Sequence, residues 1–561
     1  MLIAQRQIGG HFPLNITPYT DSNRSSLAER YRLEDSQVRE LFGSHPAEGR
    51  AWENRATYLD ETAGGRADLP RVAEAVRAYH RKLPSSAETE ISLEKLEREG
   101  ALVVVGGQQA GLFGGALLIY YKALSVIQAA REAERRLSRP VVPVFWIAGE
   151  DHDFEEANHV NVQSPGGEVR RVRIERPDGP RLAVSRTPLS AEQWSSALQE
   201  LAAQLPDTEF KPQVLDRLQS HVADAPSLSL AFARLLADWF GKQGLLLLDA
   251  DDPNLRALEG PMFRELILRS DELEASLKDG EGQVLSQGFR LQAETAPGSA
   301  NLFLHHEQGR LLLHKDDGRF VDRRGVVSHS REEMLELTAH RPDLLSTNAL
   351  TRPLMQDYLL PVLATVLGPA EIAYWAILGP AFREFGMEMP IVLPRQSYTY
   401  IEPAVASLLD KYSLTVRQAI EDWETLRAEW LGKQDEWNLE EQFRQVKEQF
   451  QALYEPVMKT VSGLQPGLAQ LASGNRDRIL EQIAYLESRS ADAIAKRHES
   501  SLRQWDRIRQ SLSPLAKPQE RVYGTVHFWN RYGPGWLSLW HDVPFEAVGG
   551  HRLVGGWQKF N

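Results

Sequence analysis

The chain has 561 residues, of which 42% are hydrophobic and 25% are charged, and its formal net charge is -13. These values are typical of a soluble globular protein of several domains. The chain contains no cysteine, which excludes disulfides, thiolate metal ligands, iron–sulfur clusters and a cysteine nucleophile. The acidic balance argues against a nucleic-acid partner, and no apolar run is long enough to cross a membrane. With neither disulfides nor an apolar signal segment, we expect a cytoplasmic protein.

The first predicted elements are helices, followed by alternating strands and helices. Residues 1–98 have mostly helical patterns, whereas Ala101–Val105 is a continuous apolar run. Such a run is typical of a strand buried on both faces of a parallel sheet. A glycine-rich turn and an apolar helix follow, and Val141–Ile147 is a second run of the same kind. This strand–helix–strand order predicts an α/β core with a parallel sheet.

The core is predicted to be discontinuous along the chain. Leu245–Leu248 and Pro390–Leu393 have the composition of two further buried strands. Between 283 and 327, short apolar runs are separated by Glu-Gln-Gly and Asp-Asp-Gly, which predicts a small antiparallel β insertion. We therefore expect residues 1–398 to form one core with amino-terminal helices and insertions.

The pattern changes to a helical one over residues 403–512. Apolar residues there recur at alternating spacings of three and four, which indicates a coiled-coil seam. Pro456 and Pro466 predict a kink or break, and Ser473–Asn475 predicts a turn between two long helices. An antiparallel helical hairpin fits best, with a globular helical bundle as the alternative. The aromatic, glycine-rich tail, residues 513–561, is expected to pack back on the core.

The first segment that could bind a ligand reads Gly-Gly-Gln-Gln-Ala-Gly-Leu-Phe-Gly-Gly at 106–115 and lies between a predicted strand and a predicted helix. Ligands of open α/β sheets bind at this position, and a helix N-terminus can offer N–H groups to an anion. The spacing matches neither the dinucleotide fingerprint nor the P-loop. A tight structural turn is the alternative. The candidate substrate-binding residues are Gln108, Gln109, Gly111 and Gly114.

The second segment, 149–156, follows the next strand and reads Gly-Glu-Asp-His-Asp-Phe-Glu-Glu. A histidine between aspartates is expected to have one fixed tautomer and a raised pKa, which suits proton transfer. The carboxylates could instead bind Mg²⁺, or form a solvated acidic loop. We predict His152 as the catalytic base, oriented by Asp151 or Asp153, and Glu150 as a substrate-binding residue.

The third segment spans residues 346–395. Arg352 is the candidate for holding an anionic substrate, because guanidinium binds carboxylate or phosphate through two hydrogen bonds; a surface ion pair is the alternative. The other candidate pocket residues here are Asn348, Gln356, Glu371, Tyr374 and Trp375. His305 and His306, in the β insertion, are expected in a solvated hairpin, where we expect no metal site.

These segments together resemble the bacillithiol biosynthesis cysteine-adding enzyme family. The resemblance rests on residues 106–115, on Val-Pro-Val-Phe-Trp-Ile-Ala-Gly-Glu-Asp-His-Asp-Phe at 142–154 and on Gly-Pro-Ala-Glu-Ile-Ala-Tyr-Trp at 368–375. It extends over the whole chain, including the helical hairpin and Asn530–Gly533. One difference is Ala116, where members of the family often have proline, which is helpful rather than essential at a helix start.

The resemblance implies a Rossmann-like core related to the nucleotidylyltransferase superfamily, inserted connecting segments, and a coiled-coil domain that supports a homodimer. It also implies the last step of bacillithiol synthesis, the joining of cysteine to the amine of a glucosamine–malate conjugate. ATP with Mg²⁺ could activate the carboxyl group, and no tightly bound metal is expected. An ATP or ADP base could stack on the tail, with Trp529, Asn530 and Tyr532 as candidate nucleotide-binding residues.

Two other functions are compatible with the same residues. A nucleotidylyl or phosphoryl transferase on this core would release pyrophosphate without cysteine. A non-enzymatic scaffold would recruit partners through the helical hairpin, although polar side chains gathered at two adjoining strand ends are costly in a disused pocket. The expected partners are therefore small molecules, namely glucosamine–malate, cysteine and ATP.

Overall fold

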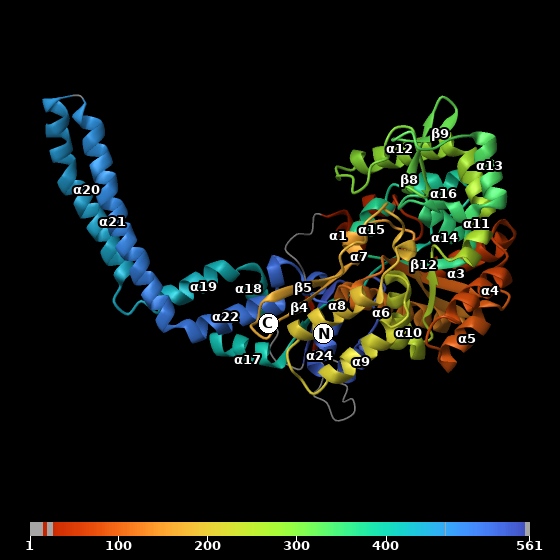
Figure 1. The fold of residues 1–561 in the computed structure, drawn as a ribbon, viewed down its shortest axis with the longest axis horizontal. Helices are drawn as coiled ribbons and strands as arrows, with labels where there is room; N and C mark the ends of the chain where they lie inside the picture. The colour runs from red at the N-terminus through yellow and green to blue at the C-terminus, as the bar shows by residue number, and fades with distance from the viewer. Residues whose placement is uncertain (1–14, 20–25, 466, 556–561) are drawn as a thin grey trace. The chain divides into compact units, whose positions relative to one another are not determined.

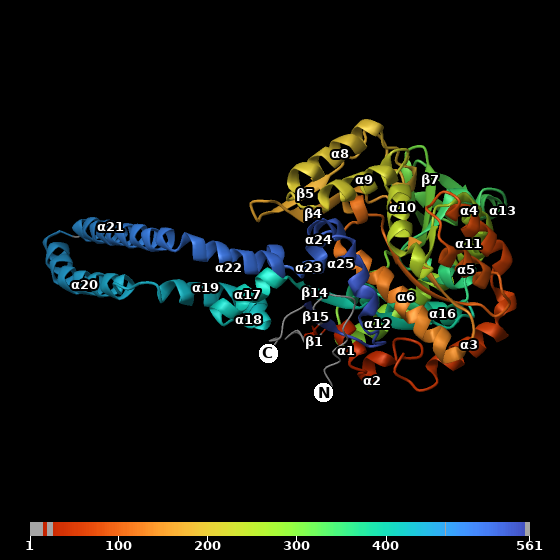
Figure 2. The same ribbon diagram turned by 90° about the horizontal axis from the view of Figure 1, so that it is seen from below.

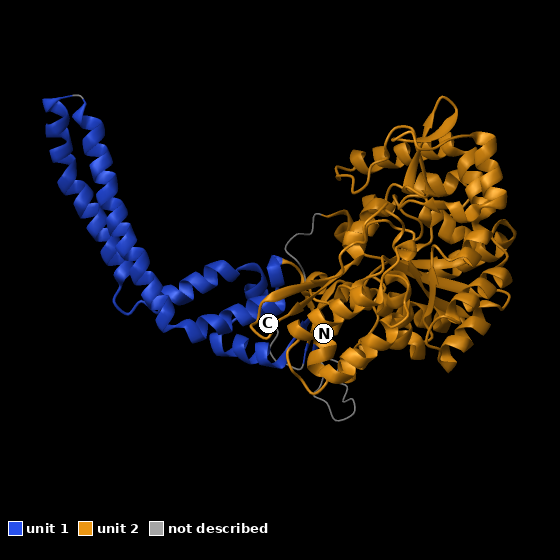
Figure 3. Cartoon of the chain, in the orientation of Figure 1, with its two compact units in different colours: residues 1–15, 400–516, 555–561 blue, residues 16–399, 517–554 orange. Residues whose placement is uncertain are grey.

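The computed structural model describes residues 15–19, 26–465 and 467–555. It divides into two compact units (Figure 3). The first, here called the sheet unit, comprises residues 16–399 and 517–554; the second, the helical unit, contains residues 400–516 and the two ends of the chain. Parts of the predicted domains, residues 1–14 and 556–561, and the proline predicted to break the hairpin, Pro466, lie outside the described residues.

A five-stranded parallel sheet forms the centre of the sheet unit (Figure 1). In spatial order its strands are β13 (Ile391–Pro394), β12 (Val362–Leu367), β2 (Leu102–Gln108), β3 (Val141–Ile147) and β6 (Leu246–Asp249). Almost every strand residue is buried, because helices pack against the sheet. The 21-residue helix α6 (Leu117–Leu137) connects β2 to β3. The predicted Rossmann-like α/β class is confirmed.

A second, antiparallel sheet occupies much of the region predicted as a β insertion. Its order is β10-β9-β8-β7-β11. The strands are β7 (Ser299–His306), β8 (Gly309–Asp316), β9 (Arg319–Asp322), β10 (Ser328–Ser330) and β11 (Leu345–Thr347). The sheet starts later than the predicted residue 283, because helix α12 (Ser270–Ser286) occupies that stretch.

The helical unit contains two long helices, α20 (Leu439–Leu464) and α21 (Leu468–Arg497), which run side by side (Figures 1 and 2). One sequence prediction is wrong here, because Ser473–Asn475 lies inside α21 rather than in a turn. Helix α20 continues through Pro456, so the chain does not break at that residue. Relative to alanine, glycine inside a helix disfavours helix formation by about 1 kcal/mol and proline by about 3 kcal/mol. The free energy gained from packing along two long helices can be larger than these amounts.

Residues 517–554, which contain most of the aromatic tail, belong to the sheet unit. They form α23 (Gln519–Val522), α24 (Thr525–Tyr532) and α25 (Pro534–Leu539). Trp540 packs on Tyr121 of α6 with ring centroids 4.7 Å apart, and Tyr120 of α6 donates a hydrogen bond to the carbonyl of Leu537 at 2.6 Å. The tail thus covers α6. None of the described helices is long and apolar enough to span a membrane.

A buried ion cluster ties helix α14 (Arg352–Leu359) to helix α3 (Ala51–Glu61). Asp357 is fully buried, and its two carboxylate oxygens contact Arg55 at 2.5 Å and Arg66 at 3.2 Å. Arg55 also donates to the carbonyl of Val362 in β12 at 3.1 Å. The cluster therefore fixes α14, whose first residue is Arg352, against the central sheet.

Replacing Asp357 with asparagine should lower the free energy of unfolding by about 3–5 kcal/mol, because two buried guanidinium groups would lose their counter-charge. Urea unfolding followed by circular dichroism measures this change. The control is Asp60→Asn, which breaks an exposed pair with Arg139 and should cost less than about 1 kcal/mol. Equal losses in the two variants would contradict the role assigned to the cluster.

Candidate functional site

A cavity of about 510 Å³ lies at the carboxyl ends of β12, β2 and β3. This edge is where parallel α/β sheets bind their ligands. All three predicted segments contribute to its lining. The predicted site residues that line the cavity are Gln108, Gln109, Glu150, Asp151, His152, Asn348, Arg352, Glu371 and Tyr374.

One wall of the cavity, here called the cationic wall, contains Lys122, Arg352, Arg395 and Arg521. Lys122 extends from α6 and is buried, and its Nζ contacts the carboxylate of Glu371 at 2.5 Å and the carbonyl of Gly107 at 2.7 Å. Glu371 lies in the first turn of α15 (Pro369–Trp375). Burial opposes its ionisation, but Lys122 and Arg352 outweigh burial and lower the pKa of Glu371.

Arg352 differs from its buried neighbours in this wall, because no described carboxylate contacts its guanidinium group. Its Nη2 donates to the hydroxyl of Tyr374 at 2.9 Å, and no carboxylate of the described residues lies within 4.0 Å of it. Arg395, in contrast, is held by both oxygens of Glu520 at 2.6 and 3.0 Å. Burial opposes the charge of Arg352, but Tyr374, Glu371 and Glu150 outweigh burial and raise its pKa. Because no carboxylate in the described part of the chain contacts it directly, the guanidinium of Arg352 is the group best placed to receive an anionic ligand.

A second part of the lining, here called the acidic wall, contains Asp151, Glu156 and His152. Gln109 bridges the two carboxylates, since its Nε2 donates to Asp151 at 3.1 Å and to Glu156 at 3.2 Å. Burial and the charges of Asp151 and Asp153 raise the pKa of Glu156. These carboxyl groups can attract a positively charged group, although Arg310, whose Nη1 lies 3.9 Å from Oδ1 of Asp151, offsets part of their charge.

His152 lies between a guanidinium and a carboxylate. Its Nδ1 is 3.4 Å from Nη1 of Arg310 and 3.7 Å from Oδ1 of Asp151. Burial and then Arg310 lower the pKa of His152, against the opposing effect of Asp151 and Asp153. The predicted raised pKa is thus wrong, because the sequence around His152 does not include Arg310. The lowered pKa favours the neutral ring, whose Nδ1 faces Asp151 and Arg310.

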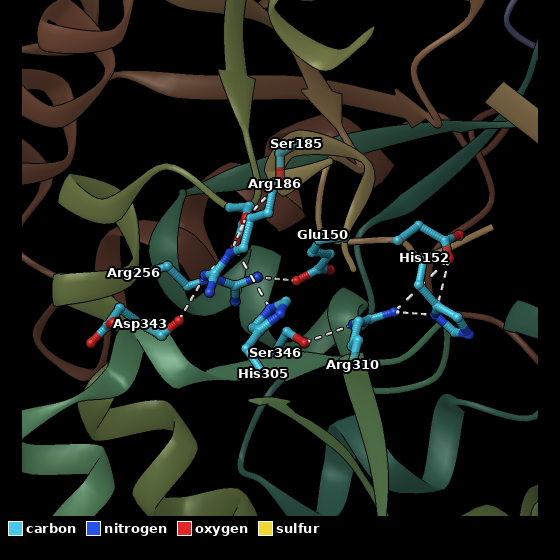
Figure 4. A network of polar contacts seen from close by, with 12 residues as sticks. Glu150, His152, Ser185, Arg186, Arg256, His305, Arg310, Asp343 and Ser346 are labelled. Atoms are coloured by element: carbon cyan, nitrogen blue, oxygen red, sulfur yellow. Dashed lines mark hydrogen bonds and ion pairs between the residues drawn. The ribbon is translucent and has the colours of Figure 1, made fainter. Parts of the chain in front are cut away.

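Arg310 reaches the cavity from β8 of the antiparallel sheet (Figure 4). Its Nε donates to the hydroxyl of Ser346 at 2.9 Å, and its Nη2 donates to the carbonyl of Thr347 at 2.5 Å. The hydroxyl of Thr347 in turn donates to Glu150 at 3.1 Å, and Glu150 forms a buried ion pair with Arg256. Sequence reasoning missed Arg310, which no motif marks, and Lys122, whose one signal is a lone charge within an apolar helix.

Comparison with known proteins agrees with this architecture. Residues 14–396 match the model of the N-terminal Rossmann-like domain of bacillithiol biosynthesis BshC, and residues 398–555 match the C-terminal coiled-coil domain of the same family. The chain belongs to the BshC family. No described group of three or more histidine, aspartate or glutamate side chains in this BshC chain is arranged to hold a metal ion.

Several BshC relatives carry the name "Putative cysteine ligase BshC". The relative from Symbiobacterium thermophilum is 37% identical, covering 90% of this chain and 93% of its own length. The relative from Bacillus cytotoxicus is 35% identical over 86% of this chain and 90% of its own length. The relative from Bacillus licheniformis is 33% identical over 92% of this chain and 95% of its own length. The similarity therefore includes both units.

Two of the predicted glycines form a structural turn and do not line the cavity. A side chain at Gly114, where φ is +92°, would overlap Trp239, and one at Gly111 would meet the backbone of Gly115. The N–H of Leu117 at the start of α6 donates to the carbonyl of Tyr523 at 2.8 Å. The tail thus takes one N–H group of this helix N-terminus, and the anion site expected there stays a prediction.

Three other predicted site residues lie outside the cavity. Asp153 caps α7 (Phe154–Ala157) by accepting the N–H of Glu156 at 3.1 Å, so it does not orient His152. Gln356 and Trp375 are buried within their helices. The periodicity of a helix places these side chains on faces that turn away from the cavity.

Two of the three residues predicted to bind a nucleotide, Trp529 and Asn530, are packed within the fold. Trp529 is buried against Trp239 with ring centroids 5.9 Å apart, and the amide of Asn530 donates to the carbonyl of Pro206 at 3.0 Å. Tyr532 is half-buried and does not line the cavity. These side chains pack the tail onto the sheet unit. The expected solvated pair of histidines is also partly wrong, because His305 is buried 3.6 Å from Asp251.

The pKa of His152 should lie below the usual histidine value of about 6.5. Arg310→Met should raise it, because a repelling charge is removed, and Asp151→Asn should lower it further, because an attracting charge is removed. An NMR titration of the ring Cε1–H measures each value. Arg324→Met, at an exposed position outside the cavity, is the control and should leave the pKa unchanged. A wild-type pKa above 6.5 would contradict the geometry.

Proposed function

We propose that this BshC protein is the cysteine ligase of bacillithiol biosynthesis, and that it joins the carboxyl group of cysteine to the amine of a glucosamine–malate conjugate. The observation that carries the proposal is that one cavity is lined both by basic groups, among them Lys122 and Arg352, and by the carboxyl groups of Asp151 and Glu156. Malate would supply two carboxylates at one end of the conjugate, and glucosamine would supply an ammonium group at the other. The cationic wall and the acidic wall match these two ends.

The malate end would bind to the cationic wall. Arg352 lacks a carboxylate partner and can offer two parallel N–H groups to one carboxylate. Lys122 is buried and already shared with Glu371, so it contributes positive potential at a fixed position. The exposed Arg521 lies at the edge of the same cavity and can add charge where the ligand enters.

The amine end would then lie against the acidic wall. An ammonium group is no nucleophile until it loses a proton, and the neutral ring of His152 can accept that proton at Nδ1. The resulting imidazolium would lie 3.7 Å from the carboxylate of Asp151, which stabilises its charge, and beside Arg310, which opposes it and so favours release of the proton. Gln109 fixes Asp151 in this position.

Amide formation from a carboxylate and an amine is uphill in water, so the cysteine carboxyl must be activated. ATP with Mg²⁺ would serve as co-substrate: a carboxylate oxygen of cysteine attacks a phosphorus atom of ATP, and pyrophosphate or ADP leaves. The amine then attacks the acyl carbon, and AMP or phosphate leaves with the formation of the amide bond. These reagents place the reaction in the cytoplasm.

We also propose that two copies of the chain pair through the helical hairpin. None of the 26 residues of α20 is buried, although its apolar residues follow a coiled-coil seam. Leu453 is 77% exposed, Leu464 is 76% exposed and Leu471 of α21 is 66% exposed. Such a continuous apolar stripe favours a partner of the same kind, because exposed seams of this length associate.

The test of the ligase reaction is reconstitution with glucosamine–malate and cysteine, with and without ATP and Mg²⁺, followed by mass spectrometry of the product. His152→Ala should lower kcat by about 10²–10⁴-fold. Arg352→Met should raise the KM for the conjugate by about 10- to 100-fold, the loss expected for one charged hydrogen-bonded contact.

Arg98→Met, which changes an exposed arginine outside the cavity, is the matched control and should retain wild-type kinetics. Wild-type kcat in His152→Ala would remove the assigned base. Pyrophosphate release that does not depend on cysteine would favour a nucleotidylyl transferase instead, and no thermal stabilisation by any of the three substrates would favour a scaffold.

Leu453→Glu combined with Leu464→Glu should convert the dimer into a monomer, because two charges would enter the apolar stripe. Light scattering after size-exclusion chromatography measures the mass, and circular dichroism checks that the helices remain. The control Glu455→Gln, on the same exposed helix, should stay dimeric. A wild-type protein that is monomeric at micromolar concentration would contradict the proposal.

A further inference from the structure

A second cavity, of about 650 Å³, lies at the carboxyl end of β6. This strand is the neighbour of β3, whose carboxyl end contributes to the first cavity. No residue lines both cavities. The polar lining of the second cavity includes Tyr79, Lys82, Arg186, Asp249, Asp251 and Asp252.

The carboxyl groups of the second cavity are not all balanced by a cation. Asp251 accepts two hydrogen bonds from Arg186, both at 2.7 Å, and Asp252 pairs with Lys82 at 2.9 Å. Asp249 is only 5% exposed, and it accepts hydrogen bonds from the hydroxyl of Ser229 and from the N–H of Asp251. No cation of the described residues lies within 4.0 Å of Asp249.

The pKa of the Asp249 carboxyl group reflects the absence of a neighbouring cation among the described residues. Burial and then the neighbouring carboxylate of Asp251 raise the pKa of Asp249 to about 7. A buried carboxyl group with no cation beside it stays protonated, or ionises when a positively charged ligand binds. An anionic ligand such as a nucleotide would add repulsion at this position, so the lining selects for a cation.

Tyr79 supplies a second, independent sign of a ligand in the same cavity. Its side chain is 4% exposed and lines the cavity, and its hydroxyl has no hydrogen-bond partner among the described residues. Asp249 and Asp252 are near enough to act on this phenol electrostatically. Because buried phenol groups are normally hydrogen-bonded, an unpartnered one beside an unbalanced carboxyl group points to a missing polar partner.

We propose that the second cavity binds a small molecule through a primary ammonium group, with the carboxyl group of Asp249 as counter-charge and the hydroxyl oxygen of Tyr79 as a neutral acceptor. The remaining walls include Pro226, Pro253 and Pro342, which offer no competing charge. The site is separate from the first cavity and does not depend on the ligase reaction.

An amino sugar and an amino acid both carry the required group, so the test uses D-glucosamine and L-cysteine as separate probes. D-glucose, which has the same ring without the ammonium group, is the control ligand. Isothermal titration is done with the full chain carrying Asp151→Asn, which weakens any competing amine binding at the acidic wall of the first cavity. At least one ammonium probe should bind saturably with one site per chain, and D-glucose should not.

Two further variants in that background locate the bound amine. Tyr79→Phe should weaken binding at least about fivefold without lowering the unfolding temperature, because the oxygen it removes has no partner. Asp249→Asn should weaken binding at least about tenfold. If Asp249→Asn does not fold, Tyr79→Phe alone decides.

Three results would overturn the proposal: no saturable binding of either probe, equal binding of D-glucose, or unchanged binding in Tyr79→Phe. Because the titration measures binding without product formation, its failure would leave the ligase reaction untouched. In the same way, absence of ligase product would not affect this site.

Discussion

The parallel pairing of β12, β2 and β3 is the constraint on which the site depends. It brings the carboxyl ends of three strands to one edge, so the segments after Gln108, Ile147 and Leu367 meet there, although they are far apart in the sequence. Both cavities lie along this edge, the second at the end of the adjoining strand β6. Elements outside the sheet then add the remaining charged groups, as the antiparallel sheet does with Arg310 and α6 does with Lys122.

Charge balance inside the sheet unit separates structural groups from groups available to a ligand. Asp357, Arg395 and Arg256 each have buried partners of opposite charge, and their positions are fixed by those partners. Arg352 and Asp249 lack such a partner among the described residues, and each lines a cavity. One is a guanidinium that no described carboxylate contacts directly, and the other is a carboxyl group whose pKa burial raises to about 7, so both can gain from a bound ligand.

The sequence was sufficient to predict the parallel α/β core and the segments that surround the first cavity. Continuous apolar runs identified β2 and β3, and polar residues directly after them identified Gln108, Gln109 and Asp151. Predictions made from neighbouring residues in the sequence failed where distant parts of the chain surround the side chain. Burial of His152 and then Arg310, which is 158 residues away in the sequence, reverse the expected direction of its pKa shift. Gly114 faces Trp239, and Trp529 is buried against the same ring, so both serve packing rather than binding. Pattern alone also could not reveal the unpartnered hydroxyl of Tyr79, which depends on burial.

The central claim is that the conjugate lies in the first cavity in one orientation, with malate on the cationic wall and the amine on the acidic wall. A crystal structure of the chain with glucosamine–malate tests this most directly. The account predicts a malate carboxylate within hydrogen-bond distance of Arg352 and the glucosamine nitrogen within reach of His152 and Asp151. The reverse orientation, or a conjugate bound outside this cavity, would contradict it.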